Sequence, residues 1–130
     1  MRHFAILALL FAPVFPVIAQ HAADQPETVM ITFRAKPGAE DELGRVIAQH
    51  WTAATAMHLL SDTPHVTVRG TENGKTYFVD IFTWRDAHTP DAAPAEIRKI
   101  WSQMNRLVES RDGRPGLEFA VVSVLAPQPR

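Results

Sequence analysis

The stretch HVTVRGTENGKTYFVDIFTW, residues 65–84, decides the fold. An Asn73-Gly74 pair separates two runs that are rich in β-branched and aromatic residues. Asn and Gly both tolerate the positive φ angles that a tight two-residue hairpin turn requires. We therefore expect residues 65–71 and 76–84 to form two antiparallel strands joined by a β-hairpin.

The flanking segments predict a strand and a helix before the hairpin, and a helix and a strand after it. Residues 28–35 alternate in hydrophobicity as a strand does, and residues 39–57 place apolar side chains at helical spacing. Pro94 suits the first turn of a second helix, Gly113 its end, and residues 117–125 the last strand. The order βαββαβ predicts a ferredoxin-like α+β domain, with a four-stranded antiparallel sheet and two helices on one face.

Residues 1–19 combine a short basic start with an uncharged apolar run, which predicts a bacterial-type signal peptide cleaved near Ala19. The run is shorter than the roughly 20 residues of a membrane span, and prolines interrupt it. We expect an exported protein, periplasmic or secreted, that is free of the membrane after cleavage. Residues 20–27 are then a linker, 28–126 the folded domain and 127–130 a tail.

The composition excludes several classes of partner. Lys and Arg number 13 against 14 acidic residues, so no basic surface for nucleic acid is expected.

The chain has no cysteine, so disulfides cannot stabilise it outside the cell. Its stability must come from packing and from assembly.

Residues 76–84 are apolar on both sides of the predicted strand. One side carries Tyr77, Val79, Ile81 and Thr83, and the other carries Phe78, Asp80, Phe82 and Trp84. Two helices cover only one face of a sheet, and a face open to water should be polar. We therefore expect a second copy of the chain to cover the other face, as a two-fold symmetric homodimer.

Three short motifs in this order carry a resemblance to a known family. Lys36-Pro37-Gly38, Asp41-Glu42-Leu43 and Trp84-Arg85-Asp86 are similar to segments of the antibiotic-biosynthesis-monooxygenase-like families of the dimeric α/β-barrel superfamily. The resemblance extends over residues 28–125. It implies two sheets that face each other as a barrel, with the helices outside. The superfamily includes cofactor-free monooxygenases of polycyclic phenols, haem-degrading enzymes and lactone isomerases.

The haem-degrading relatives use an Asn in the first strand and a His near the second helix. The first predicted strand here contains no Asn, and residues 96–110 contain no His. The histidines show no metal-binding spacing, and no glycine-rich phosphate loop is present. We therefore expect neither a metal nor an organic cofactor.

Cofactor-free oxygenation of a phenolic or enolic molecule needs an apolar pocket, a base and polar groups that hold the anion. The candidate pocket aromatics are Trp51, Phe82, Trp84 and Trp101, for which core packing is the alternative. These four side chains would form the small-molecule site if the enzyme hypothesis holds.

The candidate catalytic residues are His50 and Asp80. His50 lies near the apolar stripe of the first helix, where a buried histidine with a satisfied hydrogen bond is the alternative to a general base. Asp80 lies in the middle of a strand, where a carboxylate needs a partner. Its alternative role is a salt bridge at the dimer interface, and its candidate neighbours are Arg34, His65, Thr67 and Arg69.

The sequence leaves two functions open. The first is an exported cofactor-independent monooxygenase or isomerase. The second is a non-catalytic dimeric protein that binds a small apolar ligand.

Overall fold

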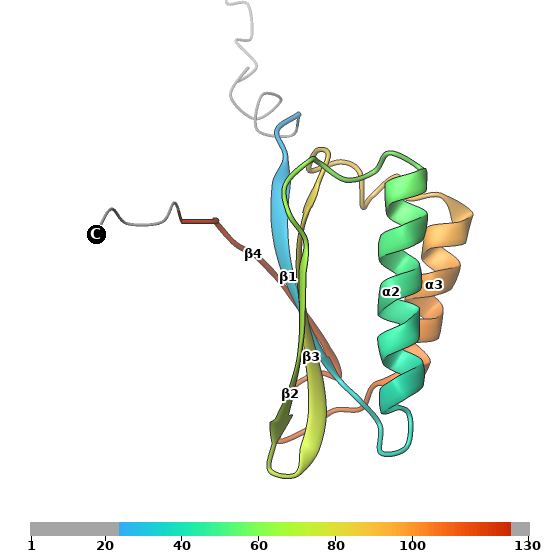
Figure 1. Cartoon of the computed structure of the whole chain (residues 1–130), viewed down its shortest axis with the longest axis vertical. Coiled ribbons are helices and arrows are strands. Elements are labelled where there is room, and N and C mark those ends of the chain that lie inside the picture. The colour runs from blue at the N-terminus through green and yellow to red at the C-terminus, as the bar shows by residue number, and fades with distance from the viewer. Residues whose placement is uncertain (1–23, 126–130) are drawn as a thin grey trace, which may run out of the picture.

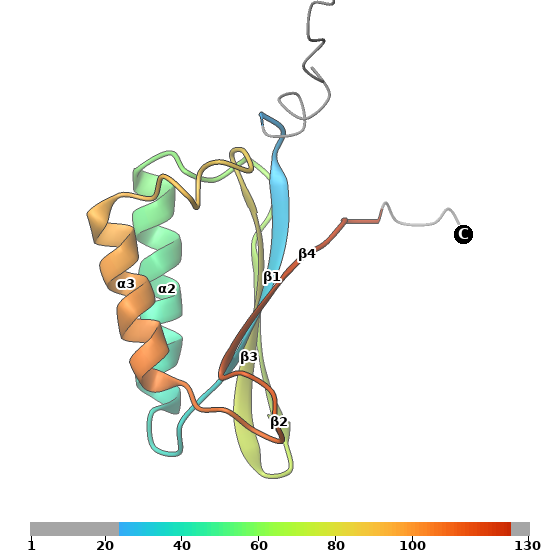
Figure 2. The same cartoon turned by 180° about the vertical axis from the view of Figure 1, so that it is seen from behind.

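The structure, a computed structural model, describes residues 24–125, so the predicted signal peptide and the tail after residue 126 lie outside the described residues. The elements are β1 (Glu27–Arg34), α2 (Glu40–Ala56), β2 (Val66–Glu72), β3 (Lys75–Trp84), α3 (Ala95–Leu107) and β4 (Leu117–Val121). The strands form one antiparallel sheet in the order β2-β3-β1-β4. Both helices pack against one face of this sheet (Figure 1), and the view from behind shows the opposite face uncovered (Figure 2). The ferredoxin-like α+β prediction is confirmed.

The hairpin forms where the Asn-Gly pair predicts it. Glu72 pairs with Lys75, and the two residues between them have positive φ angles, 51° at Asn73 and 75° at Gly74. Both residues adopt the left-handed conformation that a tight two-residue turn requires.

The prediction that Gly113 ends the second helix is wrong. The helix α3 ends at Leu107, because the backbone beyond it bonds to the strand β1 instead of continuing the helix. The Glu109 amide donates to the carbonyl of Arg34 at 2.9 Å, and the Leu107 carbonyl accepts from Lys36 at 2.9 Å. Gly113, with a φ of 74°, belongs to the turn that follows.

The last strand is also shorter than predicted, because it ends at Val121 rather than at residue 125. Its only neighbour in the sheet is β1, which begins at Glu27. The amide of Val122 still donates to the carbonyl of Thr28 at 3.0 Å. Beyond this point the chain passes the end of its partner strand, so it finds no backbone groups there with which to pair.

The core lies between the helices and the sheet and contains two clusters. One cluster gathers Phe33, Leu43, Ile47, Phe78, Ile100 and Met104, and the other gathers Val29, Ala54, Leu59, Phe82, Trp84 and Ile97. Each fully buried large apolar side chain stabilises the fold by about 1.5–3 kcal/mol. None of the helices in the described part of the chain is long and apolar enough to cross a membrane.

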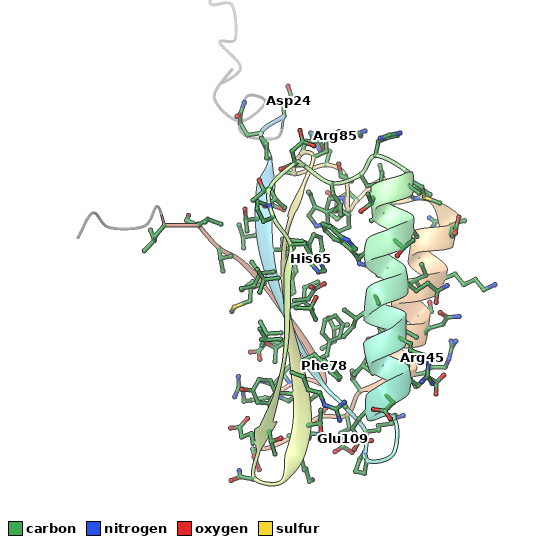
Figure 3. All side chains as sticks on the ribbon, viewed as in Figure 1. Asp24, Arg45, His65, Phe78, Arg85 and Glu109 are labelled. Carbon is green, nitrogen blue, oxygen red and sulfur yellow. The ribbon has the colours of Figure 1, made fainter. Side chains whose placement is uncertain are left out.

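The two faces of β3 divide as the sequence predicts. Phe78, Asp80, Phe82 and Trp84 are all buried on the face that the helices cover. Side chains also stand on the other face (Figure 3), where Val66 and Val68 of β2 are each 49% exposed. Half-exposed valines on an uncovered sheet face are unusual for a face that meets only water.

Candidate functional site

Two histidines lie in the layer between α2 and the sheet. His50 comes from α2, and His65 comes from the residue before β2; Figure 3 shows His65 on the side of the sheet that faces the helices. The ring of Phe82 contacts both, with centroid separations of 5.7 Å to His50 and 6.5 Å to His65. The two imidazoles therefore belong to neighbouring but separate environments.

His50 is buried, with 3% of its surface exposed, and its hydrogen bond defines its proton state. The indole N–H of Trp101 donates to Nε2 of His50 at 3.0 Å. A nitrogen that accepts carries no proton, so the neutral ring bears its proton on Nδ1. Burial, together with the nearby charge of His65, lowers the pKa of His50 to about 4. His50 is therefore neutral at physiological pH.

Aromatic rings surround His50 on the sheet side and on the α3 side. Phe82 and Trp84 meet edge to face at 4.9 Å, and Trp84 and Trp101 do so at 6.2 Å. The imidazole of His50 lies 6.0 Å from Trp84 in the same kind of contact. Edge-to-face contacts of this kind fix the orientation of rings more strictly than apolar packing alone does.

A cavity of about 280 Å³ opens beside this cluster, and we call it the α3 cavity. Its wall is mainly apolar and is formed by Ile31, Phe33, Trp84, Trp101, Met104 and Phe119, with polar groups from His50 and Asn105. A mainly apolar lining with a few convergent polar groups is typical of small-molecule sites. Of the four predicted pocket aromatics, Trp84 and Trp101 line this cavity, whereas Phe82 lies behind them in the core.

Asp80 lies on the helix-covered face of the sheet and is 1% exposed. The hydroxyl of Thr67 donates to Oδ1 of Asp80 at 2.7 Å, and Nε2 of His65 forms a hydrogen bond to the same oxygen. Burial raises the pKa of Asp80, and the bonds from Thr67 and His65 oppose that rise. Asp80 therefore faces the helices and not the open side of the sheet, and its alternative role in a salt bridge at the dimer interface stays a prediction.

Two of the four candidate neighbours of Asp80 do not reach it. Arg34 is on the opposite face, where its guanidinium donates to Glu118 at 2.8 Å and to the carbonyl of Pro115 at 2.6 Å. Arg69 donates to Asp41 at 3.2 Å.

The sequence predicted His65 only as a neighbour of Asp80 and not as a functional residue itself. Its ring stacks on Trp51, with centroids 3.8 Å apart and an angle of 13° between the planes. Both residues line a second pocket, of about 340 Å³, which we call the His65 pocket. The available signal was the alternation of strand residues: positions 65 and 67 share a face with Asp80, because Thr67 is paired with Asp80 in the sheet.

The described residues, 24–125, contain no group of three or more His, Cys, Asp or Glu side chains that could hold a metal ion. The expectation that the protein works without a metal or an organic cofactor stays a prediction.

Comparison with known proteins rests on solved structures, because no protein-family model and no curated protein match the chain. SnoaB, a cofactor-independent oxygenase from Streptomyces nogalater, superposes with a TM-score of 0.58 and 19% identity, over 82% of this chain and 99% of SnoaB.

Two further structures are similar. A conserved protein of unknown function from Bacteroides thetaiotaomicron, described as a possible oxidoreductase, has a TM-score of 0.58 and 13% identity, over 77% of this chain and all of that one. Rv0793 from Mycobacterium tuberculosis has a TM-score of 0.56 and 14% identity, over 79% of this chain and 98% of its own. At these identities the likeness concerns the fold, and it agrees with the monooxygenase-like resemblance of the sequence. The chain has the ferredoxin-like fold of a group of structures that includes a cofactor-independent oxygenase.

Proposed function

We propose that the chain is a cofactor-independent oxygenase that acts on a small phenolic or enolic molecule in the α3 cavity. The observation that carries this proposal is the cavity itself, in which aromatic and aliphatic walls meet one buried imidazole. The likeness of the fold to SnoaB supports the proposal. The apolar walls would bind a flat ring system, and His50 would meet its oxygen atom.

The role of His50 in this reaction follows from its proton state. A histidine with a pKa of about 4 is a weak base at neutral pH, so it removes a proton from a phenol poorly. Trp101 occupies Nε2, which leaves the N–H of Nδ1 as a donor. That donor would stabilise the negative oxygen of an enolate or phenolate in this mainly apolar cavity. His50 then acts by stabilising the anion that reacts with oxygen, rather than as the base.

The reaction balances without an added reductant. An enolisable CH₂ group next to an aromatic ring, as in anthrone, loses one proton to solvent water, which gives the anion. The anion donates electrons to O₂ and forms a carbon–oxygen bond. One oxygen atom remains as the new carbonyl, and the other leaves as water with the two hydrogens of the CH₂ group.

The test is the rate at which the purified protein converts anthrone to anthraquinone in air, compared with the His50→Phe variant. Phe keeps the shape of the ring but supplies no N–H, so we expect kcat/KM to fall by about 100-fold, as for other lost anion-stabilising donors. His88→Gln is the matched control, because His88 is exposed and lines neither cavity. Equal rates for His50→Phe and the unaltered protein would remove His50 from the mechanism.

A second candidate function is binding of a small apolar ligand without turnover. The lowered pKa of His50 favours it, because the α3 cavity then lacks a base of ordinary strength. In this case a ligand recovered from the protein has an unchanged mass after incubation in air. A ligand that returns with one extra oxygen atom and two fewer hydrogens excludes this function.

We further propose that the protein is exported and acts as a homodimer. The apolar run within residues 1–19 supports export, and the half-exposed valines of the open sheet face support assembly with a second copy. A fusion of residues 1–27 to alkaline phosphatase, which is active only outside the cytoplasm, tests export. An inactive fusion would contradict it.

A further inference from the structure

The cluster of Asp80, His65 and Thr67 takes no part in the α3 cavity and has a geometry of its own. Thr67 uses its hydroxyl proton to donate to Oδ1 of Asp80 at 2.7 Å. Nε2 of His65 lies 2.9 Å from the same hydroxyl oxygen and also bonds to Oδ1 of Asp80. Since both neighbouring oxygens act as acceptors toward the ring, Nε2 carries a proton. The nitrogen of His65 that gains or loses a proton is therefore Nδ1.

Two groups lie against the ring of His65, one in its plane and one on its face. The buried carboxylate of Asp80 balances a positive charge on the ring, as carboxylates do beside catalytic histidines. The indole of Trp51 stacks against the ring face at 3.8 Å, where its electron-rich surface attracts a cation. A charge on the imidazole therefore has a partner both in the ring plane and above it.

The His65 pocket gives this imidazole a place to meet a ligand. Its side chain is 15% exposed, and it lines the pocket with Trp51, Leu60, Ser61, Asp62 and Thr63. The segment of residues 60–64, between α2 and β2, is held against the end of β3, because the amide of Ser61 donates to the carbonyl of Thr83 at 2.9 Å. The hydroxyls of Ser61 and Thr63 are 2.8 Å apart, and only one of them can donate to the other. The second hydroxyl keeps a free proton for a ligand.

We infer that the His65 pocket is a second small-molecule site, in which Nδ1 of His65 takes the proton of a neutral, weakly acidic hydroxyl compound. The O–H bond of the ligand breaks, its electron pair stays on the ligand oxygen, and the proton moves to Nδ1. Asp80 and Trp51 hold the resulting imidazolium. This inference stands independently of the oxygenase proposal, because the two sites have different walls.

The charges around the His65 pocket favour one class of ligand. Asp62 lines the wall and Asp80 lies behind His65, so a permanent anion such as phosphate or a carboxylate meets two negative groups. His58 also lines this wall, and no Lys or Arg is among the residues that line it. A neutral hydroxyl compound avoids this repulsion and needs no fixed cation. Trp51 and Leu60 offer its carbon skeleton an apolar wall.

The probe for the test is 4-nitrophenol, because its phenolate is yellow and its neutral form is colourless. At a pH where the free probe is mostly neutral, we expect the protein to generate a yellow bound phenolate. His65→Gln should reduce this signal about ten-fold or more, corresponding to one pKa unit of the probe, whereas His88→Gln should retain it. An unchanged signal in His65→Gln, or no signal with the unaltered protein, would overturn the inference.

A measurement on the unaltered protein covers the case in which the variant does not fold. Two-dimensional ¹H–¹⁵N NMR with the same probe should shift the amides of residues 60–63 and of His65, and the indole N–H of Trp51. Long-range ¹⁵N spectra should show the proton of neutral His65 on Nε2. Shifts confined to Trp101 and Asn105 would mean that the probe prefers the α3 cavity, and they would contradict a second site.

Discussion

His50 shows how one buried side chain links the pH dependence of stability to the geometry of the site. Burial lowers its pKa from 6.5 to about 4, so between these pH values the unfolded chain binds a proton that the folded chain does not. Acidification through this window therefore favours unfolding, by up to about 3 kcal/mol. Asp80 acts in the opposite direction in acid, because burial raises its pKa and the folded chain then takes up a proton more readily.

We predict that this loss of stability depends on His50. Urea unfolding between pH 6.5 and about 4 should show the free energy of unfolding falling more steeply for the unaltered protein than for His50→Phe. Both proteins keep Asp80, so the difference between their curves isolates the imidazole. Parallel curves would mean that His50 is not the group that titrates.

The sequence predicted His50 and Asp80 as unusual residues and named His65 and Thr67 among four candidate neighbours of Asp80, but it did not decide between the four. A mid-strand carboxylate had to be paired, yet only the register of β2 on β3 decides that Thr67 lies opposite Asp80. His65 lies one residue before β2, and its alternation with Thr67 indicated only a neighbour of Asp80, not a site of its own. The bond from Trp101 to His50 joins residues that are 51 positions apart, which no local pattern records.

At the scale of elements, the segment after α3 depends on a close contact between backbone atoms. A Cβ added at Gly116 would meet the backbone nitrogen of Glu109 at 2.8 Å. Neither segment of this contact can move freely, because the carbonyl of Gly116 accepts from the amide of Arg34 at 2.7 Å and Glu109 donates to the carbonyl of Arg34. The segment is thus fixed on both sides by the end of β1.

We therefore predict that Gly116→Ala destabilises the protein by about 1–3 kcal/mol, as an overpacked core does. Gly113→Ala is the matched control, since a Cβ there meets no atom within 4 Å and only the positive φ of 74° opposes it. That substitution should cost about 1–2 kcal/mol, from the left-handed backbone alone. Thermal unfolding followed by circular dichroism compares the two, and a smaller loss for Gly116→Ala than for the control would contradict the packing argument.

The hairpin and the order of the elements followed from local signals, but the end of α3 did not. Asn73 and Gly74 predict their own turn because φ preference is a property of each residue. The end of α3 is set by hydrogen bonds to β1, more than 70 residues earlier in the chain, so Gly113 was a misleading stop signal. Long-range pairing of this kind overrides local preference.

At the scale of the whole molecule, the sheet face that the helices leave uncovered is the surface through which we propose assembly. Its β2 valines are half exposed, and Val79 and Ile81 of β3 lie on the same face. We predict a dimer in light scattering after size-exclusion chromatography, and a monomer for Ile81→Lys, because a buried charge without a partner opposes the interface. Ala48→Lys is the control, since Ala48 is exposed on the helix α2. A monomer for the unaltered protein would contradict assembly through this face.

The claim that the α3 cavity hosts an oxygenation is tested most directly with ¹⁸O₂. Purified protein, a metal chelator and anthrone are incubated under labelled oxygen, and the quinone is analysed by mass spectrometry against samples without protein and with His50→Phe. We predict one ¹⁸O atom in each quinone, formed faster than in either comparison sample and without any added cofactor. Bound anthrone that is converted no faster than in the sample without protein would contradict the claim and leave the chain as a binding protein.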